Sequence, residues 1–118
     1  MRVLVVENNI EMRRFIKSVI GEIADEIHES HGGDEAVDLY RSVRPDWVVM
    51  DIFRKPENGL TVAASIKKMD ADANIVFVSN YTDDRTRGWA ANAGGAAFFG
   101  KDDLLGLVEF LKSKKCGN

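Results

Sequence analysis

The chain has 118 residues, of which 45% are hydrophobic and 30% are charged, and its formal net charge at pH 7 is −3. This composition fits one globular domain that can bury its own core, so we treat 1–118 as a single domain. The acidic balance argues against direct nucleic-acid binding, and the lack of a long apolar run argues against a membrane partner.

The first half of the chain alternates apolar runs with segments of helical periodicity. The run VLVV (3–6) is short and entirely apolar, which is typical of a buried parallel strand. Apolar residues then recur at helical spacing over 10–23, EIHES (26–30) is a weaker strand with alternating polarity, and 33–43 reads as a helix. The run DWVVMDI (46–52) predicts the next strand.

The second half repeats this alternation. Helical spacing over 60–69 precedes the apolar strand NIVFVS (74–79), and a further helix is expected over 82–93. The short run AAFF (96–99) predicts the last strand, and the last helix is expected over 102–112.

Three polar residues are expected to cap helices. Asn8 precedes the first helix, and Glu11 three residues later completes a capping-box pattern. Thr82 and Asp102 are the expected caps of the last two helices. Capping by Asn8 is compatible with a metal contact from the same residue.

Strands and helices alternate five times in this short chain. Such alternation predicts an α/β fold with a five-stranded parallel sheet covered by helices on both faces. Sheets of this kind bind ligands beyond the carboxyl ends of their strands. The residues at those ends are therefore the candidates for function.

Polar side chains follow four of the five strands. Glu7 and Asn8 end the first strand, Asp51 ends the third, Ser79 ends the fourth, and Lys101 follows the fifth. Each has an ordinary explanation when taken alone, such as solvation for Glu7 and Lys101 or a local backbone bond for Ser79. Asp51 is different, because a carboxylate directly after the apolar WVVM must be paired or functional.

Together these residues suggest phosphoryl chemistry. A carboxylate nucleophile beside a divalent cation, a hydroxyl and an ammonium can form an aspartyl phosphate. Mg²⁺ prefers one or two carboxylates plus waters, and phosphoryl transfer needs mainly positioning and charge.

At these positions the chain resembles the receiver domain of bacterial two-component response regulators. The resemblance rests on VLVVEN, on RPDWVVMDI with Gly59 eight residues after Asp51, on IVFVSN and on AGGAAFFGK, in this order along the chain. It implies a flavodoxin-like sheet with strand order 2-1-3-4-5.

The resemblance also assigns roles to residues. It implies that Asp51 is the phosphoacceptor and that Glu7 and Asn8 stand where the family has the acid pair that holds Mg²⁺. The backbone carbonyl of Phe53 would be a further metal ligand, together with Asp51.

Two more positions belong to the implied switch. Ser79 matches the hydroxyl that turns toward the phosphoryl group, and Lys101 matches the lysine that pairs with that group. Phe98 matches the aromatic residue that changes rotamer on activation, although a phenylalanine at this place can equally be a core residue.

The chain departs from the family pattern near the metal site. Asn8 replaces an acid, so one negative charge is missing and Mg²⁺ is expected to bind more weakly. Lys55 stands where the family usually has proline, with Pro56 one residue later, and Asn80 follows Ser79 where a very small residue is usual.

These residues predict a non-enzymatic receiver in a phosphorelay, phosphorylated on Asp51 by a sensor histidine kinase or phosphotransfer protein. Its output would be an unknown downstream protein, and the sequence leaves a homodimer open. The single cysteine, Cys116, excludes an internal disulfide, and the chain start lacks the long apolar segment of a signal peptide, so we expect a cytoplasmic protein.

The main alternative is a pseudo-receiver, a protein-interaction module that works without phosphorylation. In that case Arg54 or Lys55 would take the place of the missing cation. A phosphatase of the haloacid dehalogenase type needs a second aspartate where this chain has Phe53. A flavodoxin needs a Ser/Thr-rich phosphate loop after the first strand, and this chain lacks one.

Overall fold

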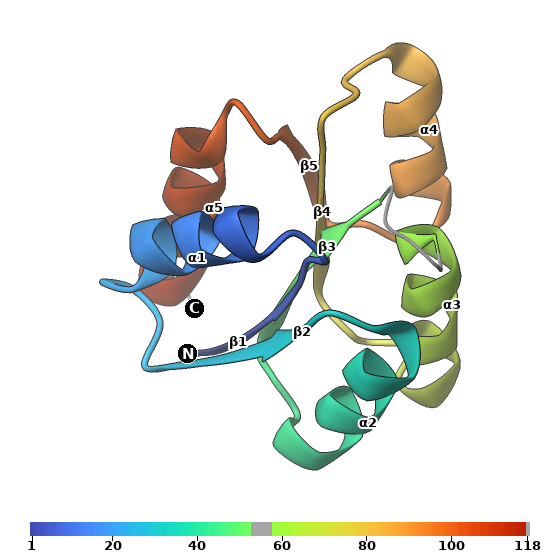
Figure 1. Cartoon of the computed structure of the whole chain (residues 1–118), viewed down its shortest axis with the longest axis horizontal. Helices are drawn as coiled ribbons and strands as arrows, with labels where there is room; N and C mark the ends of the chain where they lie inside the picture. The colour runs from blue at the N-terminus through green and yellow to red at the C-terminus, as the bar shows by residue number, and fades with distance from the viewer. Residues whose placement is uncertain (53–57, 118) are drawn as a thin grey trace.

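A computed structural model describes residues 1–52 and 58–117, and of the side chains those up to residue 115. Its core is a five-stranded parallel sheet with the order β2-β1-β3-β4-β5 (Figure 1). The strands are β1 (Arg2–Val6), β2 (Glu26–Ser30), β3 (Trp47–Asp51), β4 (Ile75–Ser79) and β5 (Ala97–Gly100). The predicted fold class and strand order are confirmed.

Five helices connect and cover the strands. They are α1 (Ile10–Ile20), α2 (Gly33–Val43), α3 (Gly59–Met69), α4 (Asp84–Asn92) and α5 (Leu104–Gly117). Figure 1 shows α1 and α5 on one face of the sheet and α2, α3 and α4 on the other. The last helix is longer than the sequence predicts, since it continues beyond residue 112.

Each face of the sheet has its own apolar core. Alternate strand residues point to opposite faces, so Val3 and Val5 pack toward α1 and α5 while Leu4 and Val6 pack toward α2 and α3. The central strands β3 and β4 are buried along their whole length. Burial on both faces explains why their sequences read as continuous apolar runs.

The helix α1 begins at Ile10, as predicted, but its N-cap differs from the prediction by one residue. Asn9, not Asn8, is the N-cap: its backbone is extended, and its side-chain Oδ1 accepts a hydrogen bond from the Met12 backbone N–H at 2.9 Å. The helix ends at Ile20, and Ile23 is buried in the turn that follows. Asn8 is thereby left exposed in the bend between β1 and α1.

The caps of α4 and α5 also lie one residue beyond the predicted positions. Asp83, not Thr82, is the N-cap of α4. At the start of α5, Asp103 Oδ1 accepts a hydrogen bond from the Gly106 backbone N–H at 3.1 Å, so Asp103 takes the role expected of Asp102. A capping residue is selected by its own backbone angles, which sequence spacing does not fix.

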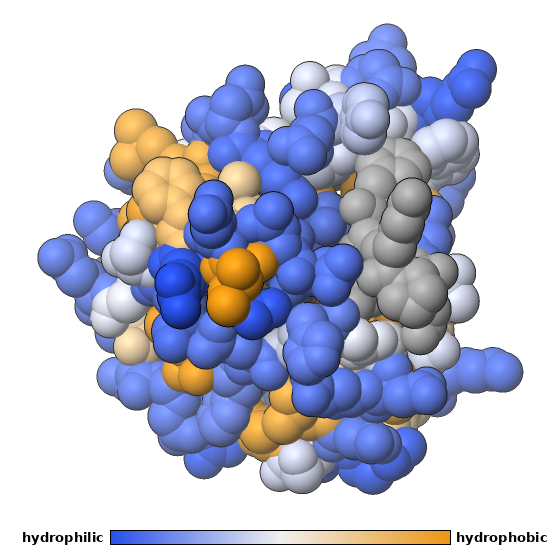
Figure 2. Space-filling model, in the orientation of Figure 1, coloured by the Kyte–Doolittle hydropathy of each residue, from blue (hydrophilic) through white to orange (hydrophobic). Residues whose placement is uncertain are grey.

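In the part of the chain that the structure describes, no helix is long and apolar enough to cross a membrane. The surface in Figure 2 is mainly hydrophilic, and most of the apolar patches in this view lie on the side of α1 and α5. Phe15 of α1 and Leu105 of α5 are 52% and 71% exposed. They line a groove of about 560 Å³ between α1 and α5 that reaches Lys101.

Candidate phosphoryl-acceptor site

The sheet register brings the polar strand ends together. Asp51 is the last residue of β3 and lies opposite Val78 of β4, so Ser79 follows one position later on the neighbouring strand. The backbone N–H of Lys101 donates to the Ser79 carbonyl at 2.8 Å, which places the β5 end beside them. Glu7 directly follows β1, which pairs with β2 on one side and with β3, the strand of Asp51, on the other.

Lys101 forms ion pairs with two carboxylates at this edge. Its Nζ lies 2.8 Å from Glu7 Oε1 and 3.2 Å from Asp51 Oδ1. The side chains of Lys101, Glu7 and Asp51 are only 10%, 2% and 4% exposed. Water screens charges poorly at such burial, so these ion pairs are electrostatically strong.

The environment of Asp51 disfavours its charged form. Burial raises the pKa of Asp51 to about 6, the negative charge of Glu7 acts in the same direction, and the nearby Lys101 opposes both. At neutral pH the carboxyl group is still mainly ionised, as a nucleophile must be. The site therefore holds a desolvated carboxylate beside a fixed positive charge.

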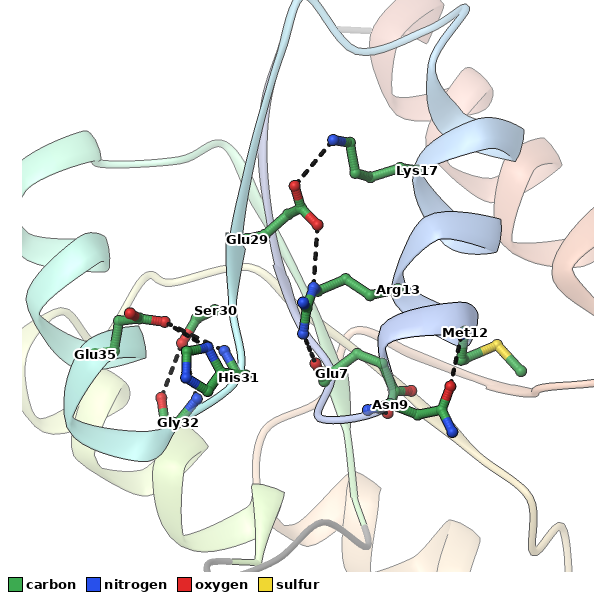
Figure 3. Close-up of polar contacts among 10 residues, drawn as sticks. All are labelled: Glu7, Asn9, Met12, Arg13, Lys17, Glu29, Ser30, His31, Gly32 and Glu35. Carbon is green, nitrogen blue, oxygen red and sulfur yellow. Dashed lines mark hydrogen bonds and ion pairs between the residues drawn. The ribbon is translucent and has the colours of Figure 1, made fainter.

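Glu7 is held by its backbone as well as by its side chain. Its backbone N–H donates to the Ser30 carbonyl at 3.1 Å, and its Oε2 accepts from the Asn9 backbone N–H at 3.1 Å. Its carbonyl accepts from Arg13 Nη1 at 2.8 Å (Figure 3). These contacts fix the turn that presents the carboxylate to Lys101.

The predicted switch residues lie on the neighbouring strands β4 and β5, and Ser79 ends the strand that pairs with β3, the strand of Asp51. Ser79 is fully buried, and its Oγ accepts a hydrogen bond from the Tyr81 backbone N–H at 2.9 Å. Phe98 is half-buried against the core on the α2–α4 side, and the Arg87 guanidinium carbon lies 4.9 Å from its ring centre. Cation–π contact of this kind stabilises a ring orientation.

The acid site, which we define as Glu7, Asp51 and Lys101, has a net negative charge that a divalent cation could neutralise. Two buried carboxylates face one ammonium, which leaves one negative charge without compensation. Glu7 Oε1 has no hydrogen bond of good geometry, and its contact with Lys101 is an ion pair. Mg²⁺ commonly takes one or two carboxylates and completes its shell with water.

The rest of the predicted metal site is less complete. Asn8 is exposed, and Phe53, Arg54 and Lys55 lie outside the described residues. Within the described ranges, no group of three or more His, Cys, Asp or Glu side chains is arranged to hold a metal. The fit therefore rests on Glu7 and Asp51.

Gly59 approaches the backbone of Asp51 closely. A Cβ atom at Gly59 would lie 2.0 Å from the Asp51 carbonyl oxygen, and the Gly59 N–H donates to the Ile52 carbonyl at 2.7 Å. A side chain at this position would displace the end of β3. This contact explains the glycine that the sequence places eight residues after Asp51.

Comparison with known proteins identifies the family. The model of the response regulator receiver domain matches residues 3–111 of this chain. The chain belongs to this family. Receiver domains are signalling domains of two-component systems and are not themselves enzymes, although some relatives, such as protein-glutamate methylesterases, are larger enzymes.

Individual relatives agree with the family. Over 100 residues the receiver is 29% identical to a chemotaxis protein CheY of Halobacterium salinarum, covering 85% of this chain and 83% of that protein. Over 79 residues it is 37% identical to a CheY of Thermotoga maritima, covering 66% of each. Its fold is similar to a LuxR-family response regulator from Aurantimonas sp., with a TM-score of 0.88 and 24% identity over 99% of this chain and 86% of that one.

Sequence reasoning missed two arginines of this receiver, one that contacts a residue of the candidate site and one that contacts a predicted switch residue. Arg13 contacts the Glu7 carbonyl, and Arg87 stacks on Phe98. Arg13 and Lys17 are four residues apart and therefore share one face of the helix. This spacing could have predicted that both contact the acidic strand β2. For Arg87 the sequence offers no comparable signal, because its contact crosses from α4 to β5.

Proposed function

We propose that this receiver accepts a phosphoryl group on Asp51 from a phosphohistidine of a sensor histidine kinase or phosphotransfer protein. The observation that carries the proposal is the pairing of a buried carboxylate with an ammonium, Asp51 Oδ1 and Lys101 Nζ at 3.2 Å. Phosphorylation then changes the surface through which the receiver binds an unknown downstream protein.

The transfer would use the site as follows. An ionised Asp51 oxygen attacks the phosphorus and forms the P–O bond, the P–N bond to the donor imidazole breaks, and its electron pair stays on the imidazole nitrogen. The Lys101 ammonium is within 3.2 Å of Asp51 and offsets charge on the transferred group. Burial of Asp51 keeps competing water away.

A magnesium ion would be held by Glu7 and Asp51, with Asn8 as an oxygen donor at the rim. When bound, Mg²⁺ supplies charge neutralisation for the phosphoryl oxygens. Because Asn8 brings no negative charge, we propose that this receiver requires more Mg²⁺ than receivers with two acids. The carbonyl of Phe53 stays a predicted ligand.

The surroundings of the site support a protein donor. Exposed apolar side chains, Phe15 and Leu105, flank the groove that leads to Lys101. Exposed apolar clusters of this kind commonly mark protein contacts. We also propose that the transfer takes place in the cytoplasm. The chain has a single cysteine, Cys116, and so no internal disulfide, which is consistent with a reducing compartment.

The proposed output is a shift between two conformations. The phosphoryl group draws the Ser79 hydroxyl toward Asp51, which frees space for Phe98 and reshapes the face from β4 to α5. Ser79 would have to give up its bond from the Tyr81 N–H. The coupling free energy is expected to be about 1–3 kcal/mol.

Intact-mass analysis after incubation with acetyl phosphate tests this function. The native chain should gain one phosphoryl group in the presence of Mg²⁺, Asp51→Asn should gain none, and the exposed Asp38→Asn should behave as the native chain. If no adduct forms at any Mg²⁺ concentration, the proposed function is rejected.

The pseudo-receiver is the second candidate, and one contact favours it. Lys101 lies closer to Glu7 than to Asp51, so the ammonium already occupies the acid site that a cation would enter. In this case the chain binds a protein in one fixed conformation. A Mg²⁺ titration followed by tryptophan fluorescence separates the two, because saturation at low millimolar metal contradicts the pseudo-receiver.

A further inference from the structure

Arg13 connects three parts of the fold beside the acid site. Its Nη1 donates to the Glu7 carbonyl at 2.8 Å, and its Nε donates to Glu29 Oε1 of β2 at 3.0 Å. The second oxygen of Glu29 accepts from Lys17 Nζ at 2.9 Å. Figure 3 shows Arg13 extending from α1 between Glu29 and the turn that carries Glu7.

The geometry suits the planar guanidinium. Arginine presents several donors in a rigid fork, so one side chain can hold a carbonyl and a carboxylate at once. Hydrogen bonds and charge from Lys17 and Arg13 hold the pKa of Glu29 below its usual range, so Glu29 stays a strong acceptor at neutral pH. The Arg13 side chain is only 15% exposed, which limits competition from water.

The contact reaches the residue on which the acid site depends. Glu7 supplies the carboxylate nearest to Lys101, and the orientation of that carboxylate follows from the backbone of the β1–α1 turn. Among the described residues, Arg13 is the only side chain hydrogen-bonded to the Glu7 carbonyl. A shift of this turn would move the carboxylate away from Lys101 and Asp51.

We infer that Arg13, oriented by Glu29, is a positioning residue that fixes Glu7 for the phosphoryl-acceptor site. Arg13 touches neither Asp51 nor the phosphoryl group. Its effect on cation binding rests on the proposed function, whereas its effect on the β1–α1 turn does not. The two consequences are therefore measured separately.

The first measurement needs neither metal nor phosphate. The Asn9 backbone N–H is bonded to Glu7 Oε2, so its hydrogen exchange reports whether Glu7 is in place. In Arg13→Met the Asn9 amide should exchange on the order of tenfold faster. Arg14→Met removes the same charge from the neighbouring exposed position of α1 and should leave this amide unchanged.

The second measurement follows Mg²⁺. Residues that orient metal ligands typically change metal affinity by about 10–100-fold. Arg13→Met should weaken Mg²⁺ binding in calorimetry by about tenfold and raise the Mg²⁺ half-saturation of phosphorylation equally, with the rate at saturating Mg²⁺ nearly retained. Lys17→Met shares the contact with Glu29 but not with Glu7 and should change neither quantity much.

Conservative variants separate positioning from folding. Glu29→Gln should shift both readouts in the same direction but less than Arg13→Met, and Arg13→Lys should restore them in part, since lysine can make one of the two contacts. These two variants also serve if Arg13→Met does not fold.

The outcomes are distinct. If Arg13→Met and Glu29→Gln leave the Asn9 exchange unchanged, or if Arg14→Met changes it equally, the inference is wrong. If the exchange responds as expected while the native chain takes up no phosphate, the positioning role stands and the proposed function fails.

Discussion

Lys101 is closer to Glu7 than to the proposed phosphoacceptor: its ammonium nitrogen lies 2.8 Å from Glu7 Oε1 and 3.2 Å from Asp51 Oδ1. The glutamate side chain reaches the ammonium directly from the end of β1. Lys101 is therefore shared between the two acids, and any change in the charge of Glu7 alters how strongly Lys101 pairs with Asp51.

Glu7→Gln should lower the pKa of Asp51. The negative charge of Glu7 is one cause of the raised value near 6, and its removal also leaves Lys101 to pair with Asp51 alone. The carboxyl ¹³C signal of Asp51, followed by NMR over pH, measures the effect. Glu11→Gln, at an exposed position of α1, is the control, and an unchanged Asp51 titration in Glu7→Gln would contradict the shared pairing.

Asp51→Asn should stabilise the fold at neutral pH. The folded pKa is near 6 and the unfolded value near 3.8, so the folded state binds more protons between these values and stability falls as pH rises through this window. The native chain thus carries a cost above pH 6, which the amide removes. The gain should be about 1–2 kcal/mol at pH 7.5. Denaturant unfolding at several pH values should show this gain shrinking toward pH 4, and a gain independent of pH would contradict the assignment.

Asn8→Asp should strengthen Mg²⁺ binding. The added carboxylate stands at the exposed rim of the acid site and restores the charge that the family pattern contains. We expect an increase in affinity on the order of tenfold, measured by calorimetry and by the Mg²⁺ dependence of phosphorylation. Asn92→Asp at the end of α4 adds the same charge away from the site, and an equal effect there would show that only net charge matters.

Gly59→Ala should destabilise the protein and impair phosphorylation. The added Cβ would meet the Asp51 carbonyl oxygen at 2.0 Å, and neither backbone can yield without moving the end of β3. A loss of about 1–3 kcal/mol is expected in denaturant unfolding. Gly88→Ala is the matched control, because nothing lies within 4 Å of its Cβ and alanine favours the helix there. Equal stability of the two variants would exclude the close contact.

Ser79→Ala should keep phosphorylation and lose the conformational response. The acceptor oxygen belongs to Asp51, whereas the Ser79 hydroxyl, now bonded to the Tyr81 N–H, is proposed to transmit the change. NMR shifts of Phe98 and α4 with and without acetyl phosphate measure the response, and Ser42→Ala on the exposed face of α2 is the control. A full response in Ser79→Ala would show that the signal takes another route.

The sequence by itself determined the sheet, its strand order through the family resemblance, and the set of polar residues at the strand ends. Period and polarity are local properties, so strands such as 3–6 and 74–79 and the acid after WVVM can be recognised without knowing the fold. The helix over 33–43 matches residue for residue. The predicted helix caps were each wrong by one residue, because backbone angles decide which of two adjacent polar residues is the cap. The observed caps are Asn9, Asp83 and Asp103.

Only the tertiary structure decided how these residues pair. Three contacts join segments that are far apart in the chain or separated by a turn: the pairing of Lys101 with both Glu7 and Asp51, the bond from Arg13 to the Glu7 carbonyl, and the close approach of Gly59 to Asp51. Differences of a few tenths of an ångström between competing partners depend on how whole elements pack. The local pattern of apolar and polar residues does not determine such distances, whereas the packing of the helices on the sheet does.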